Sequence, residues 1–404
     1  MLQEHALQGI KVADFSWVIT APLATSILAQ HGAQVVRVES MTRPCVTRPY
    51  APYKDGIPGV NRGSLFFTLN KNKYSLALDL RKPQGIEVAK RLVAWSDVVV
   101  ESFMPGTMNS LGLGYEELKR IKSDIIMMST SMLGQTGPYS KHTGLGTMLQ
   151  ALVGFNQVCG WPDRDPAFPW GAYTDSTGPF FIVIAIISAL GQRRQTGKGQ
   201  YIDVSQFECS LPFLSPAILD YNINRRVQGR WGNRSLSAAP HGVYRCKGED
   251  SWCAIAVSND EEWESFCEVI GKPDWAKDSK FTTLLSRLEN VDELDKLVEN
   301  WTLNFTPQEV MGKLQAAKVS ATVVANGQDV FEDPQLRSTG FYKMLKHAEM
   351  GETNYEGLSF TLSQTPAEIK PDPCLGQDTE YVCTEILGMS DDEFMQFLAA
   401  GVFE

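Results

Sequence analysis

The cysteines and histidines of this 404-residue chain lack the spacing of a metal site or of a redox motif. No two of the eight cysteines form a CxxC pair; they stand at positions 45, 159, 209, 246, 253, 267, 374 and 383, and the histidines at 5, 31, 142, 241 and 347. Structural zinc needs closely spaced Cys and His ligands. We therefore expect no metal site, no tightly bound cofactor, and reduced thiols in a cytoplasmic protein.

Nucleotide-binding and hydrolase motifs are missing as well. Gly144-Leu145-Gly146 is followed by Leu149 where the G-x-G-x-x-G fingerprint needs its third glycine, so these glycines do not form a dinucleotide site. The chain also has no GxxxxGK[ST] phosphate loop and no GxSxG nucleophile elbow. The sequence thus gives no support to a nicotinamide oxidoreductase, a P-loop enzyme or an elbow-type serine hydrolase.

The chain has no excess of positive charge and no long hydrophobic run. Its net charge of −10 argues against nucleic acid or an anionic membrane as a partner. The N-terminus lacks a signal-peptide pattern. The apolar run at 180–190 has 11 residues, which is too short to span a bilayer. We expect this run to form a buried helix.

The first half of the chain alternates β-rich runs with segments of helical apolar spacing. Extended segments are predicted at 10–15, 33–39, 66–80, 97–101, 124–131 and 201–205, and helices at 22–30, 83–95, 115–121 and 180–193. Strands separated by helices need crossover connections, and these produce parallel pairing. Apolar strands such as 97–101 fit a sheet covered on both faces. We predict an α/β fold with an open, Rossmann-like, mostly parallel sheet.

The composition changes in the second half. Residues 222–237 are basic, polar and aromatic, as in a linker, whereas 241–257 has the pattern of two short strands. Helices are predicted at 261–270, 290–300 and 306–317, the last opened by a capping box. We predict a large α/β domain over 1–215, a linker over 216–234, a small α+β domain over 235–340, and a linker with a C-terminal return to the large domain over 341–404.

Asp175 is the candidate for covalent chemistry. It lies in Tyr173-Thr174-Asp175-Ser176-Thr177-Gly178-Pro179, directly before the apolar run, and Pro179 suits the first turn of the helix predicted there. A carboxylate at a helix N-terminus either caps the helix or, kept ionised by the helix dipole, serves as a nucleophile. The residues alone leave both roles open, and the plain cap is the commoner one.

Seven stretches stand in the order of one known family. They are 7–15 (LQGIKVADF), 32–39 (GAQVVRVE), 69–80 (LNKNKYSLALDL), 100–106 (VESFMPG), 111–113 (LGL), 134–138 (GQTGP) and 196–204 (TGKGQYIDV). Through them the chain resembles, over essentially its whole length, the class III CoA-transferases of the CaiB/BaiF (L-carnitine dehydratase/bile-acid-inducible protein F) type. The catalytic aspartate of that family falls on Asp175.

The resemblance implies an exchange of CoA between two carboxylic acids, with an acyl-CoA as substrate. Asp175 would form a mixed anhydride and then an aspartyl-CoA thioester, with backbone N–H groups of 176–178 as oxyanion donors. By the same resemblance, CoA would contact Asn72, Lys73, Leu78, Ser102, Phe103 and Leu111, with Lys73 on a phosphate and with Phe103 and Leu78 beside the adenine. The alternative roles are a core position for Leu78 and a solvated turn for Lys73.

Departures from the family pattern concern the substrate. Ile19 replaces a glutamine, Ser40 and Ser110 replace arginines, and 235–240 holds no glycine-rich loop, which puts formate or oxalate as substrate in question. The predicted substrate pocket consists of residues near Asp175 in sequence or motif, namely Trp17, Ile19, Leu145, Trp161, Phe168, Trp170 and Tyr173. It suits an aromatic or branched acid such as an aryl-succinate, with succinyl-CoA as donor; core packing is the alternative role for the aromatic residues.

The family resemblance also raises two alternatives to a self-sufficient CoA-transferase, and it implies how the chains assemble. An α-methylacyl-CoA racemase needs a second acid–base group, but Leu145 stands at the position of its histidine and His142 is displaced from it. The chain could also be one subunit of a heteromeric CoA-transferase. The resemblance implies an interlocked dimer, either a homodimer or a heteromer with a homologous subunit, threaded at about 216–234 and 335–350.

Overall fold

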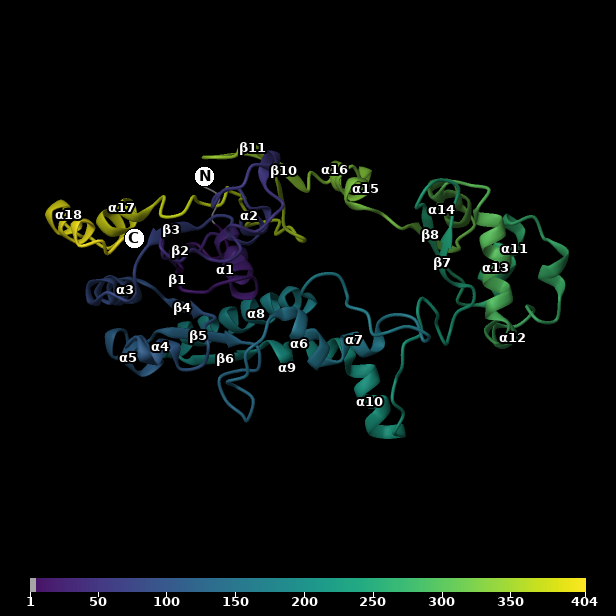
Figure 1. The fold of residues 1–404 in the computed structure, drawn as a ribbon, viewed down its shortest axis with the longest axis horizontal. Helices are drawn as coiled ribbons and strands as arrows, with labels where there is room; N and C mark the ends of the chain where they lie inside the picture. The colour runs from purple at the N-terminus through teal and green to yellow at the C-terminus, as the bar shows by residue number, and fades with distance from the viewer. Residues whose placement is uncertain (1–4) are drawn as a thin grey trace. The chain divides into compact units, whose positions relative to one another are not determined.

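The structure is a computed structural model that describes residues 5–404 (Figure 1). The chain forms two compact units. Unit 1 contains the chain up to 156, residues 168–227 and residues 338–404; unit 2 contains residues 157–167 and 228–337.

Unit 1 is built on a six-stranded parallel sheet in the order β3-β2-β1-β4-β5-β6. The strands are β1 (Lys11–Asp14), β2 (Gln34–Glu39), β3 (Tyr74–Ala77), β4 (Val98–Glu101), β5 (Ile126–Ser131) and β6 (Tyr201–Ser205). This confirms the predicted Rossmann-like sheet. The strand order reverses between β1 and β4, and in such sheets the crevice beyond the carboxyl ends of these two strands is where ligands bind.

Helices cover both faces of this sheet (Figure 1). On one face α1 (Thr20–Gln30) and α8 (Tyr173–Thr196) bury Leu28, Ile182 and Ile186 against the strands. The other face is covered by α3 (Pro83–Trp95), α5 (Tyr115–Ile121) and α18 (Asp391–Ala399). Burial on both faces explains why the strand residues are almost continuously apolar.

The remaining elements of unit 1 are short. They are α2 (Ser64–Leu69), α4 (Thr107–Ser110), α6 (Gly146–Val153), α7 (Phe155–Val158), α9 (Gln206–Ser210), α10 (Ser215–Asn224), α17 (Thr379–Tyr381), the helical turns η1 (Lys54–Gly56), η2 (Leu211–Leu214) and η4 (Val382–Ile386), and the antiparallel pair β10 (Tyr342–His347) and β11 (Gly351–Glu356). The prediction of extended chain throughout 66–80 is wrong, because α2 occupies its beginning. Helix α10 lies at the start of the predicted linker 216–234.

Helix α8 starts earlier than predicted. It begins at Tyr173, so Pro179 lies inside the helix and not in its first turn. Proline has no N–H, and the carbonyl of Asp175, four residues earlier, therefore lacks its usual helical hydrogen bond from residue 179. By length and composition α8 could cross a membrane, but Ile182, Ile186 and Ala189 are buried in the core of unit 1, as expected for a core helix.

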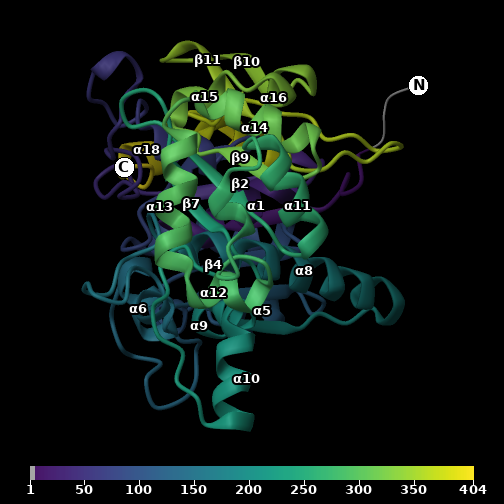
Figure 2. The same cartoon turned by 90° about the vertical axis from the view of Figure 1, so that its right-hand side faces the viewer.

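Unit 2 is an antiparallel sheet with helices on one face (Figure 2). Its strands β7 (His241–Arg245), β8 (Trp252–Ala256) and β9 (Ser320–Val323) pair in the order β7-β8-β9. Its helices are α11 (Asp260–Val269), η3 (Asp274–Lys277), α12 (Leu284–Glu289), α13 (Val291–Thr302), α14 (Pro307–Ala316), α15 (Gly327–Phe331) and α16 (Pro334–Ser338, at its end). The predicted capping box at the start of α14 is present, with Thr306 and Glu309 bonded reciprocally.

Candidate active site

Three helix N-termini of unit 1 converge on Asp175. Thr20 is the first residue of α1, Gly146 is the first residue of α6, and Asp175 lies in the first turn of α8. The N-cap residues of these helices are Ile19, Leu145 and Ala172, and none of their side chains accepts a hydrogen bond from the helix start. The N-cap of α8 is Ala172, so Asp175 does not have the plain capping role that its sequence context suggested. Its carboxylate is free for another purpose.

Gly146 allows α6 to touch this carboxylate. A Cβ added at Gly146 would lie 2.5–2.6 Å from the carboxyl carbon and both oxygens of Asp175. Such contacts are far inside van der Waals distance, and any side chain at 146 would therefore displace the carboxylate. The glycine pair at 144 and 146, which does not fit a dinucleotide fingerprint, thus has a site role that sequence reasoning missed.

Polar contacts fix α6 against the start of α8. The Thr174 hydroxyl donates to the Gly146 carbonyl at 3.1 Å. The buried Gln150 side chain accepts from the Tyr173 amide at 3.1 Å and donates to the Gly171 carbonyl at 3.2 Å. Both partners of Gln150 belong to the segment that leads into α8, so α6 determines where α8 begins and where Asp175 points.

The Asp175 carboxyl is desolvated but remains a usable nucleophile. The residue is 8% exposed. Burial raises its pKa to about 6, and hydrogen bonding by the Thr20 side chain opposes this rise. The carboxyl is therefore mostly ionised above pH 6, and its poor hydration makes the anion more reactive. Burial thus raises this pKa, whereas the sequence suggested that the helix N-terminus would favour the ionised form.

Backbone N–H groups for an oxyanion are available on α6. The amides of Gly146 and Thr147 precede the first hydrogen-bonded turn of that helix and have no intrahelical acceptor. The amides of 176–178, which were the predicted donors, belong to α8, and the helical geometry directs those of Thr177 and Gly178 to carbonyls one turn earlier. The donors at 176–178 stay a prediction, and the start of α6 offers two further amides beside Asp175.

A second group of predicted residues meets at the carboxyl ends of β1 and β4. The Ser102 hydroxyl accepts from the Trp17 amide at 2.8 Å and donates to the Trp17 carbonyl at 3.1 Å. The ring centroids of Trp17 and Phe103 are 6.3 Å apart. The exposed Arg43 places its guanidinium 5.8 Å from the Trp17 ring centroid. Two aromatic rings and an arginine thus lie close together after β1 and β4, where the strand order reverses and ligands bind in sheets of this kind.

Comparisons with known proteins identify the family. Residues 7–379 match the family model described as CoA-transferase family III. The chain is 30% identical over 400 residues to the succinyl-CoA:glutarate CoA-transferase of Mus musculus, covering 98% of this chain and 90% of that protein. It is 32% identical over 393 residues to the succinyl-CoA–L-malate CoA-transferase beta subunit of Chloroflexus aurantiacus, covering 96% and 95%.

The chain belongs to CoA-transferase family III. Its fold agrees: the crystal structure of a CaiB/BaiF family protein from Brucella suis superposes with a TM-score of 0.87 at 30% identity, covering 95% of this chain and 100% of that one. The protein is therefore an enzyme of the CoA-transferase type.

The CoA residues expected from the resemblance do not all lie together in this CoA-transferase. Ser102 and Phe103 lie beside Trp17, and Leu111 packs on the same core cluster as Phe103. Leu78 is buried in that core, which is the alternative role given above. Asn72 instead bonds the main chain of 368 and 370 and lines a cavity of about 620 Å³ with them.

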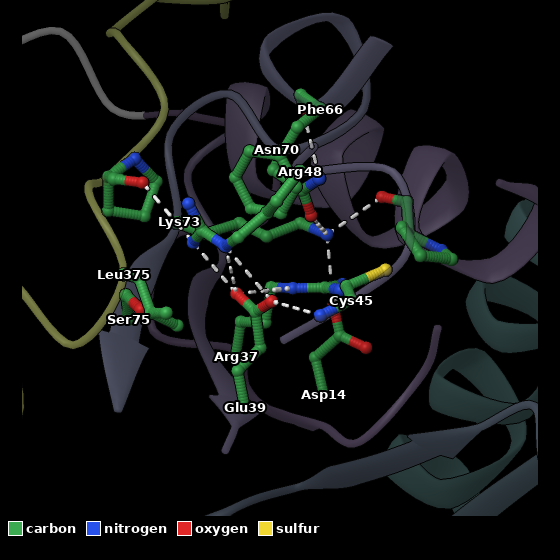
Figure 3. A network of polar contacts seen from close by, with 12 residues as sticks. Asp14, Arg37, Glu39, Cys45, Arg48, Phe66, Asn70, Lys73, Ser75 and Leu375 are labelled. Carbon is green, nitrogen blue, oxygen red and sulfur yellow. Dashed lines mark hydrogen bonds and ion pairs between the residues drawn. The ribbon is translucent and has the colours of Figure 1, made fainter. Parts of the chain in front are cut away.

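Lys73 requires a correction. Its side chain has no exposed surface, so its ammonium meets neither a CoA phosphate nor solvent in this structure. The ammonium donates to Asp14, Asn70 and the Pro22 carbonyl inside a buried network (Figure 3). The stretch before β3 carries strongly polar residues, and nothing in its local sequence distinguishes a buried ammonium from a solvated one.

The residues that were predicted to line one substrate pocket lie in different places in the structure of this CoA-transferase. Leu145 and Ile19 directly precede Gly146 and Thr20, and the Leu145 side chain is largely exposed. Tyr173 packs edge-on against Phe155 and Phe213. Trp170 is 94% exposed and Phe168 is also exposed, whereas Trp161 belongs to unit 2.

A metal has no candidate site in the part of the chain that the structure describes, because no group of three His, Cys, Asp or Glu side chains lies close enough together. All eight cysteines are unpaired thiols.

Proposed function

We propose that this enzyme transfers CoA from succinyl-CoA to a dicarboxylic acid that carries an apolar substituent, with Asp175 as the covalent carrier. The observation that supports this most is the desolvated Asp175 carboxylate where three uncapped helix starts converge. The substrate class is supported by the two relatives above, whose names give succinyl-CoA with glutarate or L-malate.

In the first half-reaction the Asp175 carboxylate attacks the thioester carbonyl carbon of succinyl-CoA. The carbon–sulfur bond breaks, the CoA thiolate leaves, and an aspartyl-succinyl anhydride forms. The carbonyl oxygen becomes negative during the attack, and the free amides of Gly146 and Thr147 are placed to donate to it. The thiolate then attacks the Asp175 carboxyl carbon, releasing succinate and leaving an aspartyl-CoA thioester.

The second half-reaction runs the same steps in reverse. The acceptor carboxylate attacks the aspartyl thioester and displaces the CoA thiolate, which then attacks the acceptor acyl carbon of the new anhydride. The acceptor leaves as its CoA ester and Asp175 is regenerated. Each step is the attack of an anion on an acyl carbon, so no proton transfer is required. The leucine at 145, where a racemase would need a base, fits this scheme and disfavours racemisation.

The adenine of CoA is proposed to bind at Trp17 and Phe103. Their rings offer stacking surface at the carboxyl ends of β1 and β4, and Arg43, which lies over Trp17, offers a guanidinium for a CoA phosphate. Arg43 takes the place of the family arginine that is missing at Ser40, three residues earlier. The phosphate contact predicted from the sequence, Lys73, does not fit because its side chain is buried.

The acceptor's apolar substituent is proposed to contact Leu145 and Tyr173. Leu145 is exposed directly before Gly146, and Tyr173 begins the helix that carries Asp175. An aryl-substituted or branched succinate would bury its substituent there, at roughly 25 cal/mol per Å² of apolar surface. Small acids such as formate gain nothing from these side chains.

The assembly is proposed to be an interlocked homodimer. An apolar stripe on α8, formed by Phe180, Ile184 and Ile187, is exposed in the single chain, as is Ile223 on α10. Exposed apolar surface of this kind is typical of an interface. The alternative, a heteromer, is supported by the relative that is named as a beta subunit. Native mass spectrometry of the purified chain separates these: a homodimer has twice the mass of one chain, whereas a subunit that requires a different partner does not form that dimer by itself.

The function is tested by incubating the purified chain with succinyl-CoA and a panel of acids, and by separating the CoA esters by liquid chromatography. The panel contains glutarate, L-malate, benzylsuccinate, formate and oxalate, with Asp175→Asn as the control. We expect CoA esters of dicarboxylates, most rapidly of benzylsuccinate, and none with the variant. Transfer to formate or oxalate alone would overturn the acceptor class, and transfer by Asp175→Asn would overturn the mechanism.

A further inference from the structure

A network of charged side chains is buried in unit 1 and is hydrogen-bonded to residues on both sides of the turn that leads into α1 (Figure 3). Asp14, Arg37, Glu39, Arg48 and Lys73 all have side chains without exposed surface. Burying charge is costly unless each group is paired and hydrogen-bonded, and a buried ion pair is often no more stable than an apolar pair of the same size. The network therefore calls for a role besides stability.

Lys73 uses all of its ammonium hydrogens inside this network. It donates to the Asp14 carboxylate at 2.9 Å, to the Pro22 carbonyl at 2.8 Å and to the Asn70 side-chain oxygen at 2.9 Å. Burial lowers the pKa of Lys73 to about 8, and the Asp14 carboxylate opposes this decrease. The group is thus charged at neutral pH and anchors the first turn of α1.

Asp14 holds the other parts of the same segment. Its carboxylate accepts from the Ser16 amide at 3.0 Å, from the Ser16 hydroxyl, and from the Thr25 hydroxyl at 2.6 Å. Asp14 and Lys73 therefore fix the chain on both sides of residues 17–21. That interval contains Trp17, at the proposed adenine site, and Thr20, which interacts with Asp175.

The held segment is strained. Val18 has φ of +68°, a conformation that is unfavourable for a β-branched residue. Strain of this kind amounts to roughly 1–3 kcal/mol and persists only where the surroundings enforce it. The Asp14–Lys73 pair supplies hydrogen bonds on both sides of Val18 that can enforce it, and an apolar pair of the same size would supply none.

We propose that Asp14 and Lys73 are positioning residues for CoA transfer, which hold the turn so that Thr20 stays beside the start of α8 and Trp17 faces Phe103. This inference rests on the proposed function. Neither residue touches the substrate. Their effect reaches the reaction through Thr20 and through the position of the Trp17 ring.

A matched pair of lysines tests this. Lys71 lies two residues before Lys73 in the same stretch and is equally buried, but its ammonium bonds Glu356 on β11, not α1. The assay is the exchange of labelled succinate into succinyl-CoA, which needs no knowledge of the acceptor. Lys73→Met is expected to lower kcat about tenfold, the value of one hydrogen bond to a charged group. Lys71→Met is expected to retain kcat.

The pH profile and a double-mutant cycle separate positioning from a general structural effect. Burial raises the pKa of Asp175 and the Thr20 side chain lowers it. No charged side chain within residues 5–404 contributes to this pKa, so the charge of Lys73 does not act on it directly. Lys73→Met should therefore move the acid limb of kcat to higher pH, as Thr20→Val should. In the Thr20→Val/Lys73→Met double variant the two effects should not add, because both changes act through the same influence of Thr20 on Asp175.

The possible results are distinguishable. Additive effects, or equal losses in Lys71→Met and Lys73→Met, would overturn the positioning role. Failure of the wild type to exchange label would instead overturn the proposed function. If Lys73→Met does not fold, the Asp14→Asn/Lys73→Met variant, which removes one buried charge of each sign and so leaves the net charge of the network unchanged, is measured in the same way. A wild-type pH profile in that folded protein would equally overturn the proposal.

Discussion

Replacing Asp175 by asparagine is expected to stabilise the folded protein at neutral pH while it abolishes CoA transfer. The reason is the environment of the carboxyl: burial raises its pKa from the ordinary 3.8 to about 6. An acid whose pKa is higher in the folded than in the unfolded state opposes folding when it is ionised. Asparagine has nearly the same shape and no charge, so it removes that opposition.

The magnitude and its pH dependence follow from the two pKa values. Each pKa unit corresponds to about 1.4 kcal/mol, so a rise from 3.8 to about 6 costs the folded protein about 3 kcal/mol at pH 8. The cost is absent below pH 3.8, grows as the pH rises towards 6, and is constant above that. At pH 5 it has reached roughly half of its full value. The stability gained by Asp175→Asn should follow the same course.

The assay is urea unfolding of wild type and variant at pH 5 and pH 8, at equal protein concentration. Asp392→Asn is the matched control: Asp392 also lies in the first turn of a helix, α18, but it is exposed. The control loses a favourable helix-end charge and should be less stable by about 0.3–1 kcal/mol at both pH values. An Asp175→Asn variant that is less stable than wild type, or whose advantage does not grow from pH 5 to pH 8, would refute the desolvation argument.

Three further predictions concern activity. Gly146→Ala should lower kcat about a hundredfold with the fold retained, because the new methyl group displaces the Asp175 carboxylate. The control is Gly191→Ala in α8, which should keep full activity, because no described atom lies within 4 Å of the added carbon. Arg43→Ala should raise KM for succinyl-CoA about tenfold with kcat unchanged, and an equal loss in kcat would contradict a pure binding role. The kcat of the wild type should fall with decreasing pH around 6, as Asp175 becomes protonated; an acid limb near pH 4 would show that the carboxyl is well hydrated.

The sheet was predictable because the strands have the apolar composition of a sheet buried on both faces and because helical segments separate them along the chain. Residues 97–101 are apolar enough for burial on both faces, and helices of amphipathic spacing separate the strands. The start of α8 was not predictable, because Thr174, Ser176 and Gly178 are weak helix formers and Pro179 favours a helix start. Gln150, more than twenty residues away, fixes this start by bonding the Tyr173 amide.

The site was predictable only in part. Asp175 could be singled out from its sequence context and the family resemblance, and the structure buries its carboxyl beside Gly146. Gly146 and Thr20 could not be connected to it, because their contacts join three separate helices. Lys73 was misplaced for a similar reason: its three acceptors come from residues 14, 22 and 70, and their convergence depends on the folded sheet.

Intact-protein mass spectrometry tests the central claim, that Asp175 carries the acyl and CoA groups, most directly. Wild type and Asp175→Asn are mixed with succinyl-CoA, quenched in acid and weighed, with and without hydroxylamine. We predict an adduct of the mass of CoA on the wild type, cleaved by hydroxylamine, located on the peptide that contains residues 173–179, and absent from the variant. An adduct that persists in Asp175→Asn, or one located on another residue, would contradict the covalent role of Asp175.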